Sequence, residues 1–317
     1  MNERNITLVT FFILEGISDV PQLQVTSFLL VLHVYLVTLG GNLAILLLVC
    51  LDSQLHTPMY FFLVNLSILD ISSSIVTLHK IPVMFVTGNH MVSFTECMAQ
   101  VYIFTWLCGN ELILLTVMSY DRYVAICKPL QYSIVMNNRV CVGLATFCWS
   151  FSLLQIFPAM LMLSQMACYI SNIIDHFLCD IIVMMSLSCS DISILEFLIF
   201  TQGVLLSIFT PFLLTFISYA FIISTIMGIK SSKGRAKTFY TCSSHLTVVT
   251  LFYATIVCQY LTPPGTFKSS KFLSLFNTAV VPMLNPIIYS LKNTDVKSAF
   301  LRKLKYFTKI VLRNNWH

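Results

Sequence analysis

Charge is what this sequence has least of. Only 10% of the 317 residues are charged, whereas 57% are apolar and the mean hydropathy is +0.85. Soluble domains usually carry about 25% charged residues, so these values exclude an ordinary soluble protein. No separate soluble domain, internal repeat or low-complexity tract is visible, and we expect no nucleic-acid partner. The composition therefore predicts a protein that resides in a lipid bilayer.

The sequence also lacks the signatures of several functional classes. It contains no HExxH and no Gly-x-Ser-x-Gly motif, so we predict that it is not an enzyme. Its 11 cysteines are scattered and never form a CxxC pair, which argues against a zinc module. No cleavable signal peptide is recognisable before the first long apolar segment, which is expected to act as a signal anchor.

Long apolar windows are abundant. A helix needs about 20 apolar residues to cross the hydrocarbon core of a membrane. Seven such windows occur, at residues 28–49, 60–78, 98–118, 140–163, 194–229, 245–261 and 272–290. The predicted fold class is an all-α integral membrane protein, a seven-transmembrane helix bundle that forms one domain over residues 1–317.

Three parts of that single domain are predicted: an extracellular tail at 1–24, the bundle at 25–291, and a cytoplasmic tail at 292–317. Basic and apolar residues alternate over 292–309, which is typical of a short amphipathic helix lying on the inner leaflet. We therefore expect membrane lipid to be a partner of this tail.

The basic residues predict the orientation. Of the 18 lysines and arginines, 14 fall in segments on one side of the predicted spans. Because positively charged loops stay in the cytoplasm, the N-terminus is expected to be extracellular and the C-terminus cytoplasmic, in a multi-pass protein of the plasma membrane. Asn5, in an Asn-Ile-Thr glycosylation motif, lies in the predicted outer tail and agrees with this orientation.

Four cysteines map to the predicted outer face: Cys97, Cys168, Cys179 and Cys189. This compartment is oxidising, so two disulfides are expected, and four cysteines permit three pairings. Three of the four lie in the longest loop, 164–191, which we predict to be a stapled lid.

Two carboxylates stand within predicted spans, Asp70 in the second and Glu111 in the third. At that depth a carboxylate costs several kcal/mol unless it is paired, protonated or facing water. The two residues therefore predict either a cation-binding or proton-linked site, or a hydrogen-bonded clamp between helices. They also permit an alternative function, an ion channel or transporter that uses both acids.

An Asp-Arg pair marks the end of the third span. Asp121 and Arg122 arrive together after a segment whose only formal charge from residue 98 to 118 is Glu111. In the last span, Pro282 and Pro286 free backbone carbonyls that Asn285 could satisfy, which predicts a kinked and adjustable helix.

Together these motifs resemble the rhodopsin-like (class A) G protein-coupled receptors, and among them the odorant receptors. The resemblance rests on Leu55-His-Thr-Pro-Met-Tyr-Phe-Phe-Leu63, Leu66-Ser-Ile-Leu-Asp70, Met118-Ser-Tyr-Asp-Arg-Tyr-Val-Ala-Ile-Cys127, Lys128-Pro-Leu-Gln-Tyr-Ser133, Ser218-Tyr219, Lys237-Thr-Phe-Tyr-Thr-Cys-Ser-Ser-His-Leu246 and Pro282-Met-Leu-Asn-Pro-Ile-Ile-Tyr-Ser-Leu-Lys-Asn293. It implies an odorant receptor that activates the olfactory stimulatory G protein and raises cyclic AMP. A chemoreceptor of the same family that acts outside olfaction is the alternative.

The resemblance also implies roles for particular residues. The activation switch and G protein interface would comprise Asp121, Arg122, Tyr123, Tyr219, His245, Asn285, Pro286 and Tyr289. The ligand, a small, volatile and mostly apolar molecule, would contact Phe104, Thr105, Cys108, Gly109, Leu112, Gly203, Ser207, Tyr253, Ile256, Val257, Tyr260 and Thr278. No cofactor is implied beyond sodium at the family's paired acidic positions, Asp70 and Glu111.

Within the resemblance, the favoured disulfides are Cys97–Cys179 and Cys168–Cys189, with Cys97–Cys189 as the alternative. The lid departs from the family pattern at two places: Tyr169 stands where a glycine usually follows the cysteine, and the gap between Cys168 and Cys179 is one residue longer than usual.

Overall fold

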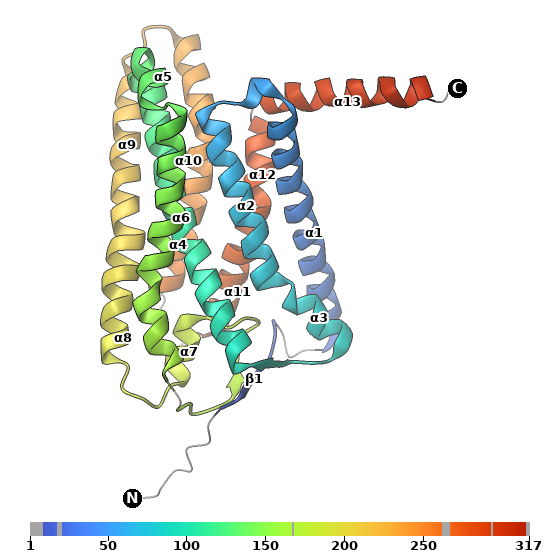
Figure 1. The fold of residues 1–317 in the computed structure, drawn as a ribbon, viewed down its shortest axis with the longest axis vertical. Coiled ribbons are helices and arrows are strands. Elements are labelled where there is room, and N and C mark those ends of the chain that lie inside the picture. Colours follow the sequence, from blue (N-terminus) through green and yellow to red (C-terminus); the bar gives the residue numbers. More distant parts are fainter. Residues whose placement is uncertain (1–8, 18–20, 167, 262–266, 293, 315–317) are drawn as a thin grey trace, which may run out of the picture.

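The computed structural model describes residues 9–17, 21–166, 168–261, 267–292 and 294–314. Long helices stand side by side in one bundle, and a further helix lies across one end of it (Figure 1). Among these residues, six helical stretches are long and apolar enough to cross a membrane, and a bent helix pair supplies a seventh. The predicted helical class and the number of spans are confirmed.

The first four spans are single long helices, with one extension. Their bounds are α1 Pro21–Leu51, α2 Pro58–Leu78 continued by α3 Lys80–Thr87, α4 Phe94–Cys127, and α6 Asn138–Ser164. Short helices lie in the connections: η1 Ser53–Leu55, η2 Pro129–Gln131, α5 Tyr132–Val135 and α7 Ile181–Leu187. Each of the first four predicted windows lies inside its helix.

The last three spans are less regular. The fifth consists of α8 Ser193–Leu198, the π-helix η3 Ile199–Phe209 and α9 Thr210–Met227; the sixth is α10 Ser232–Leu261; the seventh consists of α11 Phe267–Leu275, the π-helix η4 Phe276–Val280 and α12 Val281–Lys292. The fifth span ends at Met227, two residues before the predicted limit at 229. Helix α13, Thr294–Asn314, forms the arm in the predicted C-terminal tail.

Two predicted boundaries differ from the structure. Helix α1 begins at Pro21, inside the segment 1–24 predicted as tail. Helix α10 begins at Ser232, inside the basic stretch 230–237, because lysine and arginine favour helix as strongly as most apolar residues do. The helix bends by 45° between its Ser232–Tyr240 and Cys242–Cys258 parts. The polar entry to the sixth span is therefore a helical extension.

Local sequence explains where several helices start. Thr57 is the N-cap of α2 and Pro58 occupies the first helical position, where its missing N–H costs nothing. Helix α4 starts with a capping box in which Ser93 and Glu96 satisfy each other's backbone N–H groups. Asn137 caps α6 by accepting a hydrogen bond from the Val140 N–H at 3.1 Å.

A small three-stranded sheet closes the end of the bundle where the N-terminal segment lies, and we call this the sheet end. Strand β1 (Phe11–Leu14) is central, antiparallel to β2 (Met91–Ser93) and parallel to β3 (Ile173–Ile174). The sequence analysis missed this sheet. Asn5 lies outside the described residues.

Helix α13 marks the opposite end, which we call the arm end. It is fastened to the bundle by Arg302, whose Nη2 lies 2.7 Å from Asp52 Oδ2, and by Tyr60, whose hydroxyl donates to Asp295 Oδ2 at 3.2 Å. The Arg302 hydrogen bond holds the pKa of Asp52 below its ordinary value. Phe300, Leu301 and Leu304 are exposed on the arm, as expected for a helix with one face toward lipid.

Candidate functional site

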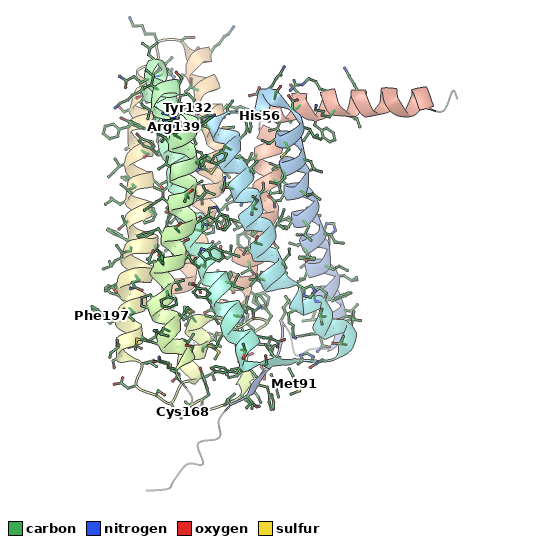
Figure 2. All side chains as sticks on the ribbon, viewed as in Figure 1. His56, Met91, Tyr132, Arg139, Cys168 and Phe197 are labelled. Carbon is green, nitrogen blue, oxygen red and sulfur yellow. A yellow bond between two sulfur atoms is a disulfide. The ribbon has the colours of Figure 1, made fainter. Side chains whose placement is uncertain are left out.

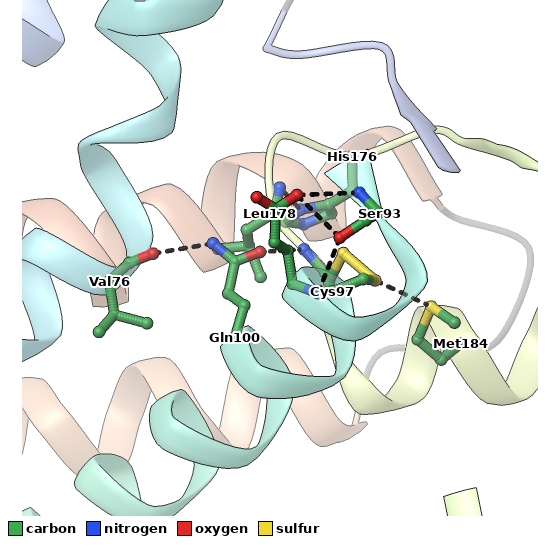
Figure 3. Close-up of a disulfide and its surroundings, with 9 residues drawn as sticks. Val76, Ser93, Cys97, Gln100, His176, Leu178 and Met184 are labelled. Carbon is green, nitrogen blue, oxygen red and sulfur yellow. Dashed lines mark hydrogen bonds between the residues drawn. A yellow bond between two sulfur atoms is a disulfide. The ribbon is translucent and has the colours of Figure 1, made fainter. Parts of the chain in front are cut away.

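The predicted lid lies at the sheet end and is held in place by covalent and hydrogen bonds. Disulfides join Cys97 to Cys179 and Cys168 to Cys189, the two pairs favoured by the resemblance. Beside the first disulfide, Gln100 of α4 donates to the Val76 carbonyl at 2.8 Å and accepts from the Cys179 N–H at 2.9 Å (Figure 3). One glutamine thus ties the lid to two spans.

Tyr169, the departure from the family pattern, is the point where the lid meets the N-terminal strand. Its ring meets that of Phe12 edge-on with centroids 5.2 Å apart, and it also lies 6.2 Å from Phe94. Phe12 is fully buried. A glycine could supply none of this apolar contact, so Tyr169 anchors β1 to the lid.

The lid carries unusual electrostatics. His176 is buried, stacks on Phe177 and accepts the Leu178 N–H at Nδ1. Its burial, together with the nearby positive charge of Lys271, lowers the pKa of His176 to about 4. Asp175 forms an ion pair with Lys271 of α11; burial alone would raise its pKa, but the hydrogen bond from Lys271 leaves it below the ordinary value. This ion pair links the lid to the seventh span.

Beneath the lid lies a partly open cavity of about 90 Å³. It is bounded by α4, α6, η3 and one turn of α10, with the lid as its roof. Of the 12 residues predicted to contact ligand, the structure brings eight together in its lining: Phe104, Thr105, Cys108, Gly109, Leu112, Gly203, Ser207 and Ile256.

The sequence analysis missed the α6 wall and the roof of this cavity. Helix α6 contributes Ser152 and Gln155, η3 adds Gln202, and the lid contributes Asp180. Asp180 is buried and caps α7 by accepting the Ile182 N–H at 2.9 Å. Burial raises the pKa of Asp180, an effect that this hydrogen bond partly opposes. None of the 12 residues predicted to contact ligand is charged, so the carboxylate of Asp180 is an addition that the sequence analysis did not anticipate.

Three of the other predicted contacts lie elsewhere, and the side chain of the fourth, Tyr260, is not described. Tyr253 and Val257 face a separate apolar groove between α9 and α10, where the Tyr253 ring meets Phe212 edge-on at 5.2 Å. Thr278 is buried in η4 and donates to the Ser274 carbonyl at 2.8 Å. The Tyr260 side chain lies outside the described residues.

A polar cluster occupies the middle of the bundle. Asp70 is fully buried, and Asn285 Nδ2 donates to both of its carboxylate oxygens, at 3.0 and 3.1 Å. Glu111 lies close enough for its charge to interact with that of Asp70. The sequence analysis assigned Asn285 to the carbonyls freed by proline, but the Pro282 carbonyl instead accepts from Asn42 Nδ2 at 3.2 Å.

Oxygen atoms around this cluster fit a hard cation. Among the described side chains, Glu111 Oε1, Asn285 Oδ1 and Ser74 Oγ are buried without a hydrogen-bond partner. Ser74 lies one helical turn after Asp70 on α2, so both face the same way. Carboxylate, amide and hydroxyl oxygens are the ligands that hard cations prefer. The described residues contain no cluster of three or more His, Cys, Asp or Glu, so neutral oxygens would complete such a site.

The Asp-Arg motif forms an ion pair near the arm end. Arg122 Nε donates to Asp121 Oδ2 at 2.9 Å, and Arg122 Nη2 contacts the same oxygen. The other carboxylate oxygen, Oδ1, accepts from the Tyr132 hydroxyl at 2.8 Å. Tyr132 and Arg139 lie at the arm end, far from Cys168 and Met91 at the sheet end (Figure 2). The cavity and the ion pair therefore occupy opposite halves of the bundle.

Residues of the predicted switch lie around this ion pair on neighbouring helices. The Tyr219 hydroxyl is 2.7 Å from His245 Nδ1, joining α9 to α10, while Tyr123 packs on Phe221 of α9 with centroids 5.9 Å apart. Tyr289 of α12 is buried, and its hydroxyl has no hydrogen-bond partner among the described residues.

Pro286 shows why glycine stands at residue 41 in α1. A Cβ added to Gly41 would lie 2.9 Å from Pro286 Cγ, so any larger residue would push the first and seventh spans apart. This close approach holds the helix that carries Asn285 and Tyr289 against α1.

Comparison with solved structures identifies the architecture. The chain matches the crystal structure of squid rhodopsin with a TM-score of 0.71, covering 92% of this chain and 88% of that chain at 17% sequence identity. The fold is therefore that of a rhodopsin-like G protein-coupled receptor.

The sequence comparisons identify the family. The olfactory receptor family model matches residues 31–306. Olfactory receptor 6C1 of Homo sapiens is 44% identical over 310 residues, covering 96% of this chain and 99% of the relative, and Olfactory receptor 5AR1 of Mus musculus is 43% identical over 302 residues, covering 95% and 97%. This chain belongs to the olfactory receptor family.

Proposed function

We propose that this odorant receptor binds a small, mostly apolar molecule in the cavity under the lid and activates the olfactory stimulatory G protein, which raises cyclic AMP. The observation that carries the proposal is the cavity, which residues of four spans and the disulfide-bonded lid line together. Its lining of Phe, Leu, Ile, Val and Ala with a few polar groups is typical of a small-molecule site.

The signal would pass to the ion pair at the arm end. Helix α4 lines the cavity with Phe104 to Leu112 and carries Asp121 and Arg122 two to three turns further on. Arg122 is held by Asp121 in this conformation, which we assign to the resting state. Ligand binding would favour a state in which Arg122 is released to the G protein.

The same proposal sets the orientation of the chain in the plasma membrane. The sheet end would face outside, where disulfides form, and the arm end would face the cytoplasm, where most of the basic residues gather. The apolar residues Phe300, Leu301 and Leu304 of α13 would then lie in the inner leaflet.

The polar cluster would hold a sodium ion. Asp70 and Glu111 would supply charge, and Ser74 and Asn285 would supply neutral oxygens. When bound, the cation supplies the positive charge that two neighbouring buried carboxylates lack. Purified receptor should melt at higher temperature in sodium chloride than in choline chloride, and Asp70→Asn should remove the difference. An equal melting temperature of the unchanged receptor in both salts would refute the assignment.

A cyclic AMP assay tests the main function. Cells expressing this chain with the olfactory stimulatory G protein should respond in a saturable way to neutral odorants. Arg122→Ala should abolish the response at equal surface expression, whereas Arg139→Ala, a matched loss of a basic side chain at the same end, should leave most of it. A full response from Arg122→Ala would show that the ion pair is misassigned.

A further inference from the structure

The fifth span changes its helical form where it lines the cavity. Helix η3 is a π-helix of 11 residues, Ile199–Phe209, between the α-helices α8 and α9. Most π-helices are single-turn bulges inside an α-helix, and they are frequent at functional sites. The part of the lining that η3 supplies includes Gln202, Gly203 and Ser207. The π form therefore decides which side chains of the fifth span face a ligand.

Side-chain hydroxyls record this change of form. In an α-helix such a hydroxyl commonly donates to the carbonyl four residues earlier, as Ser218 of α9 does to Leu214 at 2.8 Å. In η3 the step is five residues, because Ser207 donates to the Gln202 carbonyl at 3.0 Å. Residues five apart stand about 140° apart around an α-helix, since each residue turns the chain by ~100°. Gln202 and Ser207 can therefore share one face only in the π form.

Gln155 of α6 contacts both of these residues at once. Its Nε2 donates to Ser207 Oγ at 2.7 Å and also contacts the Gln202 carbonyl oxygen. A primary amide carries two hydrogens, so one can go to each acceptor. One amide can reach both acceptors only while Gln202 and Ser207 lie on the same face. The contact therefore stabilises the π form relative to the α-helix.

Packing inside the protein gives η3 little support of its own. None of the 11 described residues of η3 is buried, whereas α9 buries Pro211, Thr215 and Tyr219 among others. The start of α9 is also held to α4, because the Thr116 hydroxyl lies 3.2 Å from the Pro211 carbonyl oxygen and 3.1 Å from Thr215 Oγ1. The fifth span is thus anchored below η3, and the hydrogen bonds from Gln155 hold the part that lines the cavity.

Proline accounts for only part of this π-helix. Pro211 has no N–H, and its ring crowds the carbonyl four residues earlier. The π-helix η4 of the seventh span stands in a similar relation to Pro282 and has only five residues, Phe276–Val280. Helix η3 has 11 residues and so extends beyond the reach of the proline ring. A second cause must maintain the turns of η3 that lie nearer the lid.

We propose that Gln155 is a positioning residue that sets the ligand specificity of this receptor. By holding η3 in the π form, it keeps Gln202 and Ser207 together on the cavity face. Without its amide the segment would return to the α-helix, these two residues would stand on different faces, and the wall offered to a ligand would change. The inference rests on the proposed function and adds a specificity determinant on α6 to it.

The first test is structural and needs no ligand. Gln155→Met keeps the length of the side chain and removes both amide hydrogens. In an electron cryomicroscopy structure of the purified variant, the Gln202 carbonyl should accept from the Leu206 N–H, as in an α-helix, and not from the Ser207 N–H. Gln165→Met, the same change at the exposed end of α6, is the matched control and should keep η3. A Gln155→Met variant that keeps the π form would overturn the proposal.

The second test measures specificity with a series of odorants that differ by one methylene. Binding is read from the melting temperature of the purified receptor, and signalling from cyclic AMP in cells. One methylene in an apolar pocket changes affinity by about tenfold or more, so Gln155→Met should alter the order of preference within the series. Gln165→Met should leave that order unchanged. A uniform loss of potency for every odorant would overturn the role of Gln155 in specificity.

Ser207→Ala is the second variant if Gln155→Met does not fold. It removes one acceptor of the Gln155 amide together with the hydroxyl bond to Gln202, so it should also return η3 to the α-helix. The double variant should change the order of preference little more than either single variant does, because both remove the same contact. Fully additive changes would show that the two residues act separately and would overturn the proposed contact.

Failure of the inference and failure of the proposed function give different results. An order of preference that changes in the melting temperatures, with no odorant raising cyclic AMP in any variant, would refute the signalling function and leave the role of Gln155 standing. A saturable cyclic AMP response whose order is the same in the unchanged receptor and in Gln155→Met would leave the function standing and overturn the inference.

Discussion

Asn285 holds the carboxylate of Asp70 by both of its oxygens: Asn285 Nδ2 donates to Oδ1 at 3.0 Å and to Oδ2 at 3.1 Å. Asn285→Leu would leave this fully buried carboxylate without those bonds, and we expect a loss of about 1–3 kcal/mol in the free energy of unfolding. Thermal unfolding of the purified receptor measures it.

A double-mutant cycle supplies the control for that experiment. Asp70→Leu combined with Asn285→Leu should be more stable than the sum of the two single losses predicts, because both polar partners are then gone. Strictly additive losses would mean that the two residues act independently.

The Tyr132 hydroxyl restrains Asp121 in the conformation described here. Tyr132→Phe removes a hydrogen bond to a carboxylate, a kind of bond that contributes about 1.5–3 kcal/mol. If Asp121 holds Arg122 at rest, the resting state loses that stabilisation and basal cyclic AMP should rise severalfold in cells. Ser133→Ala is the neighbouring control and should change little. An unchanged basal level in Tyr132→Phe would remove Tyr132 from the restraint.

Phe12 and Phe11 offer a matched pair on one strand. Phe12 is fully buried against Tyr169, whereas Phe11 is 37% exposed. Phe12→Ala should destabilise the sheet by about 3–5 kcal/mol, and Phe11→Ala by far less. Limited proteolysis of the N-terminal segment reports this difference, because cleavage should accelerate only in Phe12→Ala. Equal protection of both variants would show that the strand is not held by this contact.

The low pKa of His176 predicts that the folded lid loses stability in acid. Its pKa falls from 6.5 to about 4, mainly because it is buried, so the unfolded lid binds a proton more readily than the folded lid does. Stability is therefore complete above about pH 6.5 and declines as the pH falls toward 4. At pH 5 we expect a loss of about 2 kcal/mol relative to pH 7.5.

Hydrogen exchange of residues 170–189 at pH 7.5 and pH 5 tests this prediction. His176→Gln should remove most of the difference, since glutamine does not titrate. His90, whose Nδ1 contacts the Leu14 carbonyl at 2.9 Å, is the control histidine at the same end. If His90→Gln rather than His176→Gln removed the pH effect, the assignment to His176 would be wrong.

The spans could be predicted from the sequence because bilayer thickness imposes a length that apolar runs reveal directly. The windows 98–118 and 140–163, for example, each lie inside one long helix, α4 and α6. The sequence analysis missed elements that lie outside the spans, where bilayer thickness imposes no length. Residues 230–237 fall between the fifth and sixth predicted windows, yet most of them are helical, because lysine and arginine are good helix formers. Strand β1 is four consecutive apolar residues with no alternation, so no period marks it.

Site residues could be predicted where family motifs give their places along a helix. They could not be predicted where the packing of one element on another decides which side chains reach the cavity. Residues on α4 and η3 follow from family motifs, and eight of those predicted for the ligand do share one cavity. Gln155 and Asp180 carry no motif; the first reaches the cavity through the packing of α6 on η3, and the second through the disulfide that pulls the lid inward. Tyr253 and Val257 line the groove between α9 and α10 instead, and their predicted contact with ligand stays a prediction.

Because β1 pairs in parallel with β3, it cannot complete its sheet until much of the chain has been synthesised. Residues 11–14 are made early, yet their partner strand at Ile173–Ile174 follows only after four spans. At about 5–20 residues per second, the first strand waits roughly ten to thirty seconds for its neighbour. During that interval Phe12 and an unpaired strand edge are open to other chains, so the N-terminal segment is where a chaperone would be needed most.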